Sequence, residues 1–248
     1  YTDTVSTFLS DPNVETTTVD GYAYRSSSTS TWASLHDGVG TTHSDSATVH
    51  YMTYLDGSAT TDRWDLLLRG IALFDTSSLP DNDVISIAIL SIDGNAKTDP
   101  LSIAQDSNIY SANPASNIDL VNEDYTTLGT TAYATAISYA DFSTTLKNNY
   151  TFNAAGIAAI DKTGITKLGM TSEDDATDTE PTWAGSGASY ARGDSADASG
   201  TTQDPVLEVT HSLPIPQEDI PYALSTVNGG EFVIGNTSDT YNATYSGD

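Results

Sequence analysis

Two short apolar runs constrain the fold of this chain more than any other feature. Residues 66–75 read Leu-Leu-Leu-Arg-Gly-Ile-Ala-Leu-Phe-Asp, and residues 84–92 read Val-Ile-Ser-Ile-Ala-Ile-Leu-Ser-Ile. Both runs are too short for typical helices and are rich in branched side chains, a pattern typical of strands that are buried on both faces. We therefore expect two central strands in a β-sheet core.

The polar composition extends this expectation to the whole chain. The 248 residues include 37 Thr and 29 Ser, and 27 of the 34 acidic residues are Asp. Thr favours strands, Asp and Ser favour turns and caps, and helix surfaces prefer residues such as Lys, of which there are only 4. We expect one all-β sandwich or barrel, interrupted by short helices at 141–146 and 153–160, the second with Asn153 as its N-cap.

Turn and proline signals divide the chain into four parts. Residues 1–18 are polar and contain an Asp-Pro-Asn turn, so we interpret them as an N-terminal arm. Residues 19–211 hold the strand-like segments of one β-sandwich domain. A proline-rich linker at 212–221 leads to a tail at 222–248, in which Phe232, Val233 and Ile234 form one strand-like piece.

The formal net charge of −26 limits the partners of this chain. Such a surface repels phosphate backbones and anionic lipid headgroups, so we expect neither nucleic acid nor a membrane as a partner. The acidity has two open interpretations, a halophile's solvated surface and an exposed extracellular or virion protein kept soluble by repulsion. With no Cys, no apolar run of 18 residues and no signal-peptide pattern, we expect a soluble, already processed chain.

Several ordered motifs resemble DNRLRE-type domains over about residues 19–211. The central motif is Leu-Leu-Arg-Gly-Ile-Ala-Leu-Phe-Asp-Thr-Ser-Ser-Leu-Pro at 67–80, followed by the apolar strand at 84–90. The supporting matches are Val19-Asp20-Gly21, Trp32, Phe142-Ser143-Thr144, the helix start at 153–156, Thr166-Lys167-Leu168-Gly169 and Asp204-Pro205-Val206-Leu207-Glu208-Val209-Thr210. The resemblance implies a non-catalytic, jelly-roll-like antiparallel β-sandwich of the kind found in secreted polysaccharide-active, cell-surface and phage or virion proteins. Some relatives bind carbohydrate, so the resemblance assigns no single function.

Residues that could carry catalysis form no recognisable motif. His36, His43 and His50 are spaced seven apart, which matches neither adjacent helical turns nor a known zinc pattern, so we favour surface or hydrogen-bonded histidines over a zinc site. Ser195 lies in Gly-Asp-Ser-Ala-Asp rather than in a Gly-x-Ser-x-Gly elbow. Among 34 acids, no pair of glycosidase carboxylates stands out. We therefore expect no enzyme activity.

Calcium is the better candidate among metals, since hard cations take carboxylate and carbonyl oxygens. Three loops offer such oxygens densely, at 81–83, 93–95 and 173–175, and the last contains Asp174 and Asp175. None of them has the spaced ligands of an EF-hand. For each loop we favour solvated turn acids, and we expect no obligatory cofactor.

Arg69 is one of only four arginines and lies inside an apolar strand. A buried guanidinium needs a carboxylate partner, because an unpaired charge is costly away from water. Asp75 and the acidic run at 173–178 are the candidate partners. We expect a structural ion pair rather than a ligand site.

Aromatic residues and sequons bear on an extracellular role. Three Trp and 14 Tyr could stack on the apolar face of a sugar, with core packing as the competing interpretation. Trp64 and Trp183 are flanked by Asp, Gly and Pro, and we expect this pair to be exposed. Asn149, Asn236 and Asn242 begin N-glycosylation sequons, which fit an extracellular chain.

These observations favour a non-catalytic structural subunit of an extracellular or virion filament or surface coat. Copies of the chain would assemble through the N-terminal arm and the tail strand at Phe232, Val233 and Ile234, because a short apolar strand can add to a neighbour's sheet edge. Head-to-tail addition does not close and produces filaments. The alternative is a carbohydrate-binding module or adhesin, with glycans as partners and Trp64 and Trp183 on one exposed face.

Overall fold

The computed structural model describes residues 2–214, 224–227, 231–236 and 239–243. The chain divides into two compact units, Thr2–Ser212 and Leu213–Asp248. The first unit is built from antiparallel strands with short helices in the connections. Its strands are β1 (Thr4–Leu9), β2 (Asp20–Ser30), β3 (Thr42–Ser44), β4 (Val49–Gly57), β5 (Trp64–Asp75), β6 (Val84–Thr98), β7 (Ser107–Ser111), β8 (Lys147–Thr151), β9 (Ile165–Ser172), β10 (Gly187–Asp194) and β11 (Val206–Ser212). Its helices are α1 (Trp32–His36), the 3-10 helix η1 (Asn122–Thr126), α2 (Ala154–Ala158) and α3 (Glu173–Ala176).

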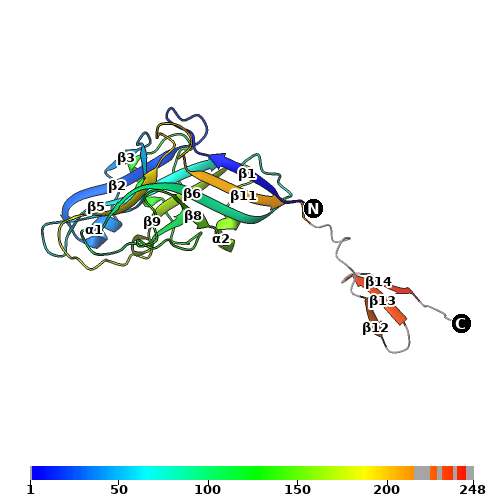
Figure 1. Cartoon of the computed structure of the whole chain (residues 1–248). Helices are drawn as coiled ribbons and strands as arrows, with labels where there is room; N and C mark the ends of the chain where they lie inside the picture. The colour runs from blue at the N-terminus through cyan, green and yellow to red at the C-terminus, as the bar shows by residue number, and fades with distance from the viewer. Residues whose placement is uncertain (1, 215–223, 228–230, 237–238, 244–248) are drawn as a thin grey trace. The chain divides into compact units, whose positions relative to one another are not determined.

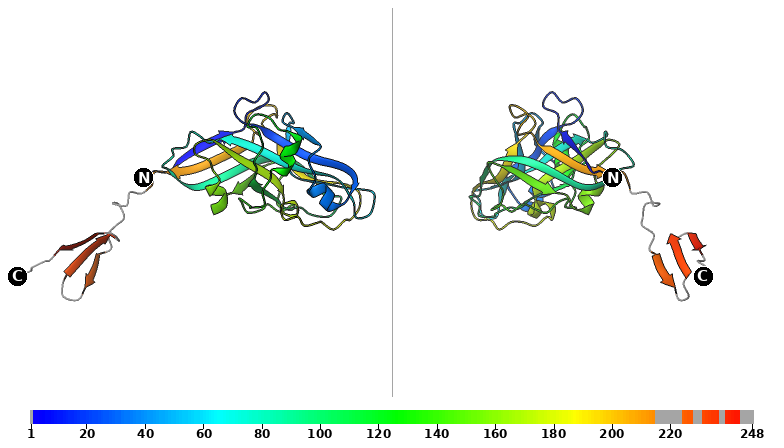
Figure 2. Two further views of the ribbon diagram at one scale, coloured as in Figure 1. Left: turned by 180° about the vertical axis from the view of Figure 1, so that it is seen from behind. Right: turned by 45° about the vertical axis from the view of Figure 1, so that its right-hand side comes forward.

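The strands form one eleven-stranded antiparallel sheet that folds into two layers (Figure 1). Its main path runs β1-β11-β6-β10-β4-β5-β2-β3, while β8 pairs with β6 and β9 pairs with both β5 and β7. The long strand β6 links the layers, because it pairs successively with β11, β8 and β10. Figure 2 shows the two layers from further sides. The expected all-β antiparallel sandwich with short helices is confirmed.

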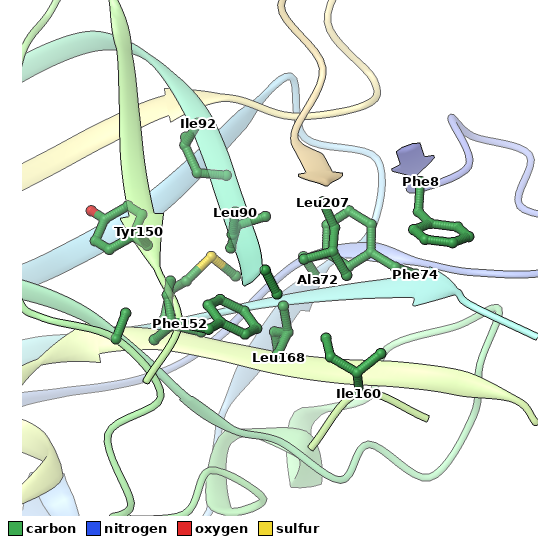
Figure 3. Packing of buried hydrophobic residues seen from close by; sticks show 14 of the residues in the cluster. Phe8, Ala72, Phe74, Leu90, Ile92, Tyr150, Phe152, Ile160, Leu168 and Leu207 are labelled. Carbon is green, nitrogen blue, oxygen red and sulfur yellow. The ribbon is translucent and has the colours of Figure 1, made fainter. Parts of the chain in front are cut away.

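The main core lies between the two layers (Figure 3). Leu90 of β6 and Leu207 of β11 come from one layer, and Phe74 of β5 and Leu168 of β9 come from the other. All four side chains are fully buried. Side chains alternate along β11, so Leu207 is buried while Glu208 is exposed. Most of β5 is buried, as its continuous apolar run predicts.

Three expectations about local structure are wrong. Residues 1–18 are not a free arm, because Thr4–Leu9 forms β1 and pairs with β11 along its whole length. Residues 141–146 form turns rather than a helix, whereas α2 does begin after its expected cap, Asn153. The third concerns α1, because the glycines at 38 and 40 favour a loop over residues 32–40, whereas Trp32–His36 is helical. Thr31 starts this helix, because its hydroxyl accepts a hydrogen bond from the Ser34 amide.

The second unit holds a three-stranded antiparallel sheet. Its strands are β12 (Leu224–Val227), β13 (Glu231–Asn236) and β14 (Asp239–Ala243). β13 is the central strand, with β12 paired on one side and β14 on the other. Most of the expected proline-rich linker at 212–221 lies outside the described residues.

Candidate functional site

A buried ion pair forms the base of the most developed site. Arg69, near the middle of β5, is only 7% exposed, and its Nε and Nη2 donate to the two carboxylate oxygens of Asp175 at 2.8 and 2.7 Å. Its Nη1 donates to the Tyr125 carbonyl at 2.8 Å, and the guanidinium carbon lies 4.2 Å from the centre of the Tyr125 ring. This buried cation is therefore both charge-paired and hydrogen-bonded, as its position requires.

The predicted pairing of Arg69 with Asp75 is wrong. Asp75 ends the strand that contains Arg69, and six residues of extended strand span about 20 Å. Asp75 Oδ1 instead accepts hydrogen bonds from the Ser77 amide and hydroxyl, at 3.1 and 2.6 Å. The partner comes from the other predicted source, the acidic run at 173–178.

Asp175 is held by its own turn as well as by Arg69. Ser172 caps α3 by accepting from the Asp175 amide at 3.2 Å, and Thr171 Oγ1 donates to Asp175 Oδ2 at 2.6 Å. Burial alone would raise the pKa of Asp175, but Arg69 and the Thr171 hydroxyl hold it below its ordinary value. This carboxylate is ionised and occupied, so its predicted role as a calcium ligand is wrong. Among the described residues, no cluster of metal-type ligands includes Asp174.

His36, the last residue of α1, lies beside this ion pair and contacts two further carboxylates. Its Nδ1 lies 2.7 Å from Asp37 Oδ1 and 3.3 Å from Asp178 Oδ1, and its Nε2 lies 2.8 Å from the Asp175 carbonyl oxygen. The Trp32 ring stacks on the imidazole, with centres 5.6 Å apart, and its indole N–H donates to Asp178 at 2.9 Å. The sequence could not predict this cluster, because its members are distant in the chain. Trp32 and Asp178, which form a hydrogen bond, are 146 residues apart in sequence.

A pocket of about 610 Å³ lies beside the ion pair and the histidine. Arg69, Asp175 and His36 line it. Two threonines, Thr126 and Thr171, line it as well. Its walls therefore offer charges and hydroxyl groups. Leu128 and Ala176 add apolar surface to the same lining, so the pocket is mixed and its charged groups would orient a polar ligand.

The three histidines spaced seven apart occupy separate settings. His43 is exposed, and its Nδ1 lies 2.8 Å from Asn122 Oδ1. His50 is fully buried, with Nε2 at 3.7 Å from a carboxylate oxygen of Asp20. Burial raises the pKa of Asp20 to about 8 and lowers the pKa of His50 to about 4, so both groups are mainly uncharged near pH 7. No shared zinc site of His36, His43 and His50 exists in this arrangement.

The two tryptophans expected on the surface pack inside. Trp64 is fully buried, and its indole N–H donates to Glu180 Oε1 at 2.8 Å. Trp183 is partly buried against the same apolar cluster and donates to the Ser58 carbonyl at 3.2 Å. The polar sequence around Trp64 was misleading, because strand alternation directs Asp65 to the opposite face. The expectation of an exposed Trp64 and Trp183 pair is wrong.

A cluster of tyrosines lies on the surface instead. Tyr54 of β4 and Tyr190 of β10 are opposite each other, and their rings stack with centres 5.8 Å apart and planes 6° apart. Tyr51 lies 5.3 Å from Tyr54 and 6.0 Å from Tyr190, because a bulge in this strand pair brings both β4 tyrosines together. Tyr22 of β2 adds a fourth ring, 5.5 Å from Tyr51. All four side chains are partly exposed, and we call them the tyrosine cluster.

The other two loops considered for calcium also hold carboxylates with basic partners. Asp83 Oδ2 lies 2.6 Å from His211 Nδ1, and Asp93 Oδ2 lies 3.0 Å from Lys147 Nζ. Each contact uses an oxygen that a cation would need. The pairings favour structural turn acids over calcium ligands in these loops.

The asparagines that begin the three sequons lie on strands. Asn149 is exposed in β8, and its Oδ1 accepts a hydrogen bond from Ser91 Oγ at 2.8 Å. Asn236 is the last residue of β13, and Asn242 lies in β14 opposite Val233. The exposed Asn149 side chain is accessible to a modifying enzyme.

The sandwich has an unprotected edge at β1, which Figure 1 shows beside β11. β11 pairs with one side of β1, and no strand in the described part of the chain pairs with the other side. The sequence Thr-Val-Ser-Thr-Phe-Leu lacks the charges and prolines that usually protect an edge strand. Val5 is 59% exposed and Leu9 is 42% exposed. Ile87 of β6, 46% exposed, shares the outer face with Val5, since both pair with Thr210 of β11.

The tail strand has no such free edge. Phe232, Val233 and Ile234 lie in β13, which is paired on both sides by β12 and β14. A strand with both edges paired has no backbone groups left for a neighbour. The expectation that these three residues form the donor strand is therefore wrong, and the outer strands of this small sheet are β12 and β14.

A scan of the chain against protein-family models finds no match, and a search of curated proteins finds no relative. The resemblance to DNRLRE-type domains therefore stays a prediction. Among the described residues, no helix is long and apolar enough to span a membrane.

Proposed function

We propose that this chain is a non-catalytic structural subunit that assembles with copies of itself into an extracellular or virion filament or surface coat. The observation that carries the proposal is the unprotected edge of β1. Free backbone N–H and C=O groups along a strand form a template for another strand, and monomers normally cover or charge such an edge. Here the edge is uncharged and carries exposed Val5 and Leu9 on an otherwise acidic chain.

The complementary element in the next copy is an edge of the three-stranded sheet. We favour β12, because its sequence Leu-Ser-Thr-Val is uncharged, whereas β14 begins with Asp239. Backbone hydrogen bonds between β1 of one copy and β12 of the next would extend one sheet into the other. Donor and acceptor are different surfaces, so the contact is head-to-tail and produces an open filament.

Composition and the family resemblance are consistent with this proposal. DNRLRE-type sandwiches, which the chain resembles, occur in secreted, cell-surface and virion proteins. The charge of −26 keeps unassembled copies apart and soluble, while strand pairing needs no charged side chain. We place the protein outside the cell or on a virion surface, with no nucleic acid and no membrane among its partners.

Negative-stain electron microscopy and light scattering of the full chain test the proposal. We expect regular filaments or a lattice from the unchanged protein. Val5→Lys puts a charge on the free edge, and deletion of 213–248 removes the donor, so both variants should stay as single chains. Val39→Lys, at a loop residue of similar exposure (56%), is the matched control and should assemble normally. A 26.2 kDa monomer at all protein and salt concentrations would overturn the proposal.

A carbohydrate-binding module or adhesin is the second candidate, and the tyrosine cluster favours it. Stacked and edge-on rings with exposed surface are the kind of platform on which the apolar face of a sugar packs. A glycan array with the full chain tests this candidate. We expect Tyr54→Ala and Tyr190→Ala to abolish any binding that the array detects, whereas Tyr133→Ala, outside the cluster, should retain it. Binding that survives loss of the cluster would reject this site.

A further inference from the structure

Three atoms of the kind that bind metals converge at the pocket. They are His36 Nδ1, Asp37 Oδ1 and Asp178 Oδ1, and all lie within 4.8 Å of one another. Two residues come from the end of α1 and the residue after it, and the third follows α3. The cluster is therefore built from segments that are distant in sequence and held together by the fold.

One hydrogen of His36 can be placed from the contacts of its ring. Its Nε2 faces the backbone carbonyl oxygen of Asp175 at 2.8 Å. A carbonyl oxygen only accepts hydrogen bonds, so Nε2 carries the hydrogen. Its Nδ1 lies 2.7 Å from Asp37 Oδ1, in hydrogen-bonding geometry, and 3.3 Å from Asp178 Oδ1, so the position between these atoms suits a positive charge, either a proton on Nδ1 or a metal ion that takes its place. Asp178 Oδ1 also accepts from the Trp32 indole N–H at 2.9 Å, and Nδ1 can bind a metal ion only after it has lost any hydrogen.

We propose that these three residues bind one divalent first-row transition ion of the zinc type. Zinc takes imidazole nitrogen together with carboxylate oxygen, whereas calcium and magnesium prefer oxygen alone. Ligands about 2.0–2.1 Å from a tetrahedral ion lie roughly 3.3 Å apart, and the Nδ1–Asp178 distance of 3.3 Å already matches this spacing. The Asp37 carboxylate is exposed and free to move the small distance required.

Neighbouring groups hold the three ligands in the orientation that metal binding needs. Histidine ligands usually donate their second N–H to a carbonyl or carboxylate, as His36 does to Asp175. Trp32 fixes Asp178 through its indole N–H and stacks on the His36 ring. Arg69 donates to the His36 carbonyl at 3.3 Å and to Asp175, so the buried ion pair supports both sides of the cluster.

The fourth coordination position would face the pocket. His36, Asp37 and Asp178 all line this pocket, whose volume is about 610 Å³. Three protein ligands with an open position leave room for water or for a carboxylate or hydroxyl of an external ligand. The site thus differs from a closed structural zinc site.

Isothermal titration with Zn²⁺ tests the proposal on the full chain, first treated with chelator and studied at about 0.15 M salt to screen diffuse attraction by the acidic surface. We expect one Zn²⁺ per chain, with a change in tryptophan fluorescence because Trp32 contacts two of the ligands, and no displacement by excess Ca²⁺ or Mg²⁺. His36→Gln and Asp178→Asn should each weaken binding at least tenfold. His43→Gln, an exposed histidine outside the cluster, should bind Zn²⁺ as the unchanged chain does.

Two further readouts separate metal binding from a purely structural cluster. Trp32→Phe removes the N–H that positions Asp178 but keeps an aromatic ring beside His36, and we expect roughly tenfold weaker Zn²⁺ binding. Nitrogen NMR of the imidazole should show hydrogen on Nε2 of His36 and a large shift of Nδ1 when Zn²⁺ is added. The proposal is overturned if the unchanged chain binds no Zn²⁺, if His36→Gln binds it equally well, or if Nδ1 keeps a hydrogen in the presence of Zn²⁺. Unfolding temperatures confirm that each variant is folded.

Discussion

Arg69 and Asp175 form a two-point ion pair that joins β5 to α3 across 106 residues of sequence. Both groups are buried, so neither charge can turn to water when its partner is removed. The pair also organises the pocket, because Arg69 and the Asp175 backbone both contact His36. Stability and the geometry of the candidate site therefore depend on the same contact.

Breaking this pair should be among the most damaging single changes in the sandwich. Asp175→Asn leaves the guanidinium buried without a counter-charge, and we expect the free energy of unfolding to fall by about 3–5 kcal/mol. Urea unfolding followed by tryptophan fluorescence measures the loss. Asp75→Asn on the same sheet is the control and should cost less than about 1 kcal/mol, since Asp75 only accepts from Ser77.

Replacing both partners tests whether the pair is needed for stability. The double variant Arg69→Met with Asp175→Leu removes both charges, so it should recover most of the stability that Asp175→Asn loses. Equal losses in the single and double variants would show that packing, not the unpaired charge, causes the damage. The urea midpoint and slope distinguish these outcomes.

The buried groups Asp20 and His50 predict opposite effects of pH on stability. The pKa of Asp20 rises from 3.8 to about 8 on folding, so its contribution to stability declines as pH increases between these values. The pKa of His50 falls from 6.5 to about 4, so its contribution is lost as pH decreases through this window. Above pH 6.5, Asp20 is the one of these two groups that still makes the free energy of unfolding depend on pH.

Asp20→Asn should therefore reduce the decline in unfolding free energy between pH 6.5 and 8. The amide keeps the shape of the protonated carboxyl and cannot ionise. Urea unfolding at several pH values gives the slope, and Asp62→Asn, at an exposed residue, should leave it unchanged. A slope that Asp20→Asn does not alter would mean that this carboxyl is already ionised in the folded protein.

Core and surface aromatics should respond differently to truncation. Trp64→Ala opens a large cavity and removes the donor to Glu180, and we expect a loss of about 3–5 kcal/mol. Tyr54→Ala removes a partly exposed ring that stacks on Tyr190, and we expect about 1 kcal/mol. Thermal unfolding of the two variants measures the contrast. Similar losses would contradict the assignment of Trp64 to the core and Tyr54 to the surface.

Assembly should become faster with salt. Each copy carries a charge of −26, and the Debye length falls from about 30 Å at 0.01 M salt to about 8 Å at 0.15 M. Screening weakens the repulsion between copies but leaves backbone pairing at β1 nearly unaffected. Light scattering at fixed protein concentration measures the rate. A rate that decreases with salt would indicate that ion pairs, rather than strand pairing, hold the copies together.

Patterns within one element predicted the fold well. The apolar runs at 66–75 and 84–92 lie in β5 and β6, and Asn153 caps α2. In each case the sequence pattern and the element that it predicts occupy the same few consecutive residues. Hydrophobic periodicity and residue propensity are then enough to predict the element. β1 was missed because its alternation is masked by Thr and Ser, which are frequent throughout the chain.

The candidate site depended on contacts that no local pattern contains. The sequence showed that Arg69 needs a carboxylate, but the choice between Asp75 and Asp175 depends on how β5 and α3 are placed. His36 and Asp178 meet for the same reason. Trp64 was misjudged because flanking polarity says little about the face on which a strand residue lies.

The pairing of β1 with β11 also has a mechanical consequence. The two strands are antiparallel, and Thr4 at the start of β1 pairs with His211 near the end of β11. A force that pulls these two ends apart therefore acts on one residue pair at a time. The strands separate sequentially, from Thr4 towards Leu9. Resistance to such a force is low at every step, because the hydrogen bonds of the ladder are never stretched together. In a filament, tension on the edge strand would open the sandwich locally before it disrupted the core behind Phe8.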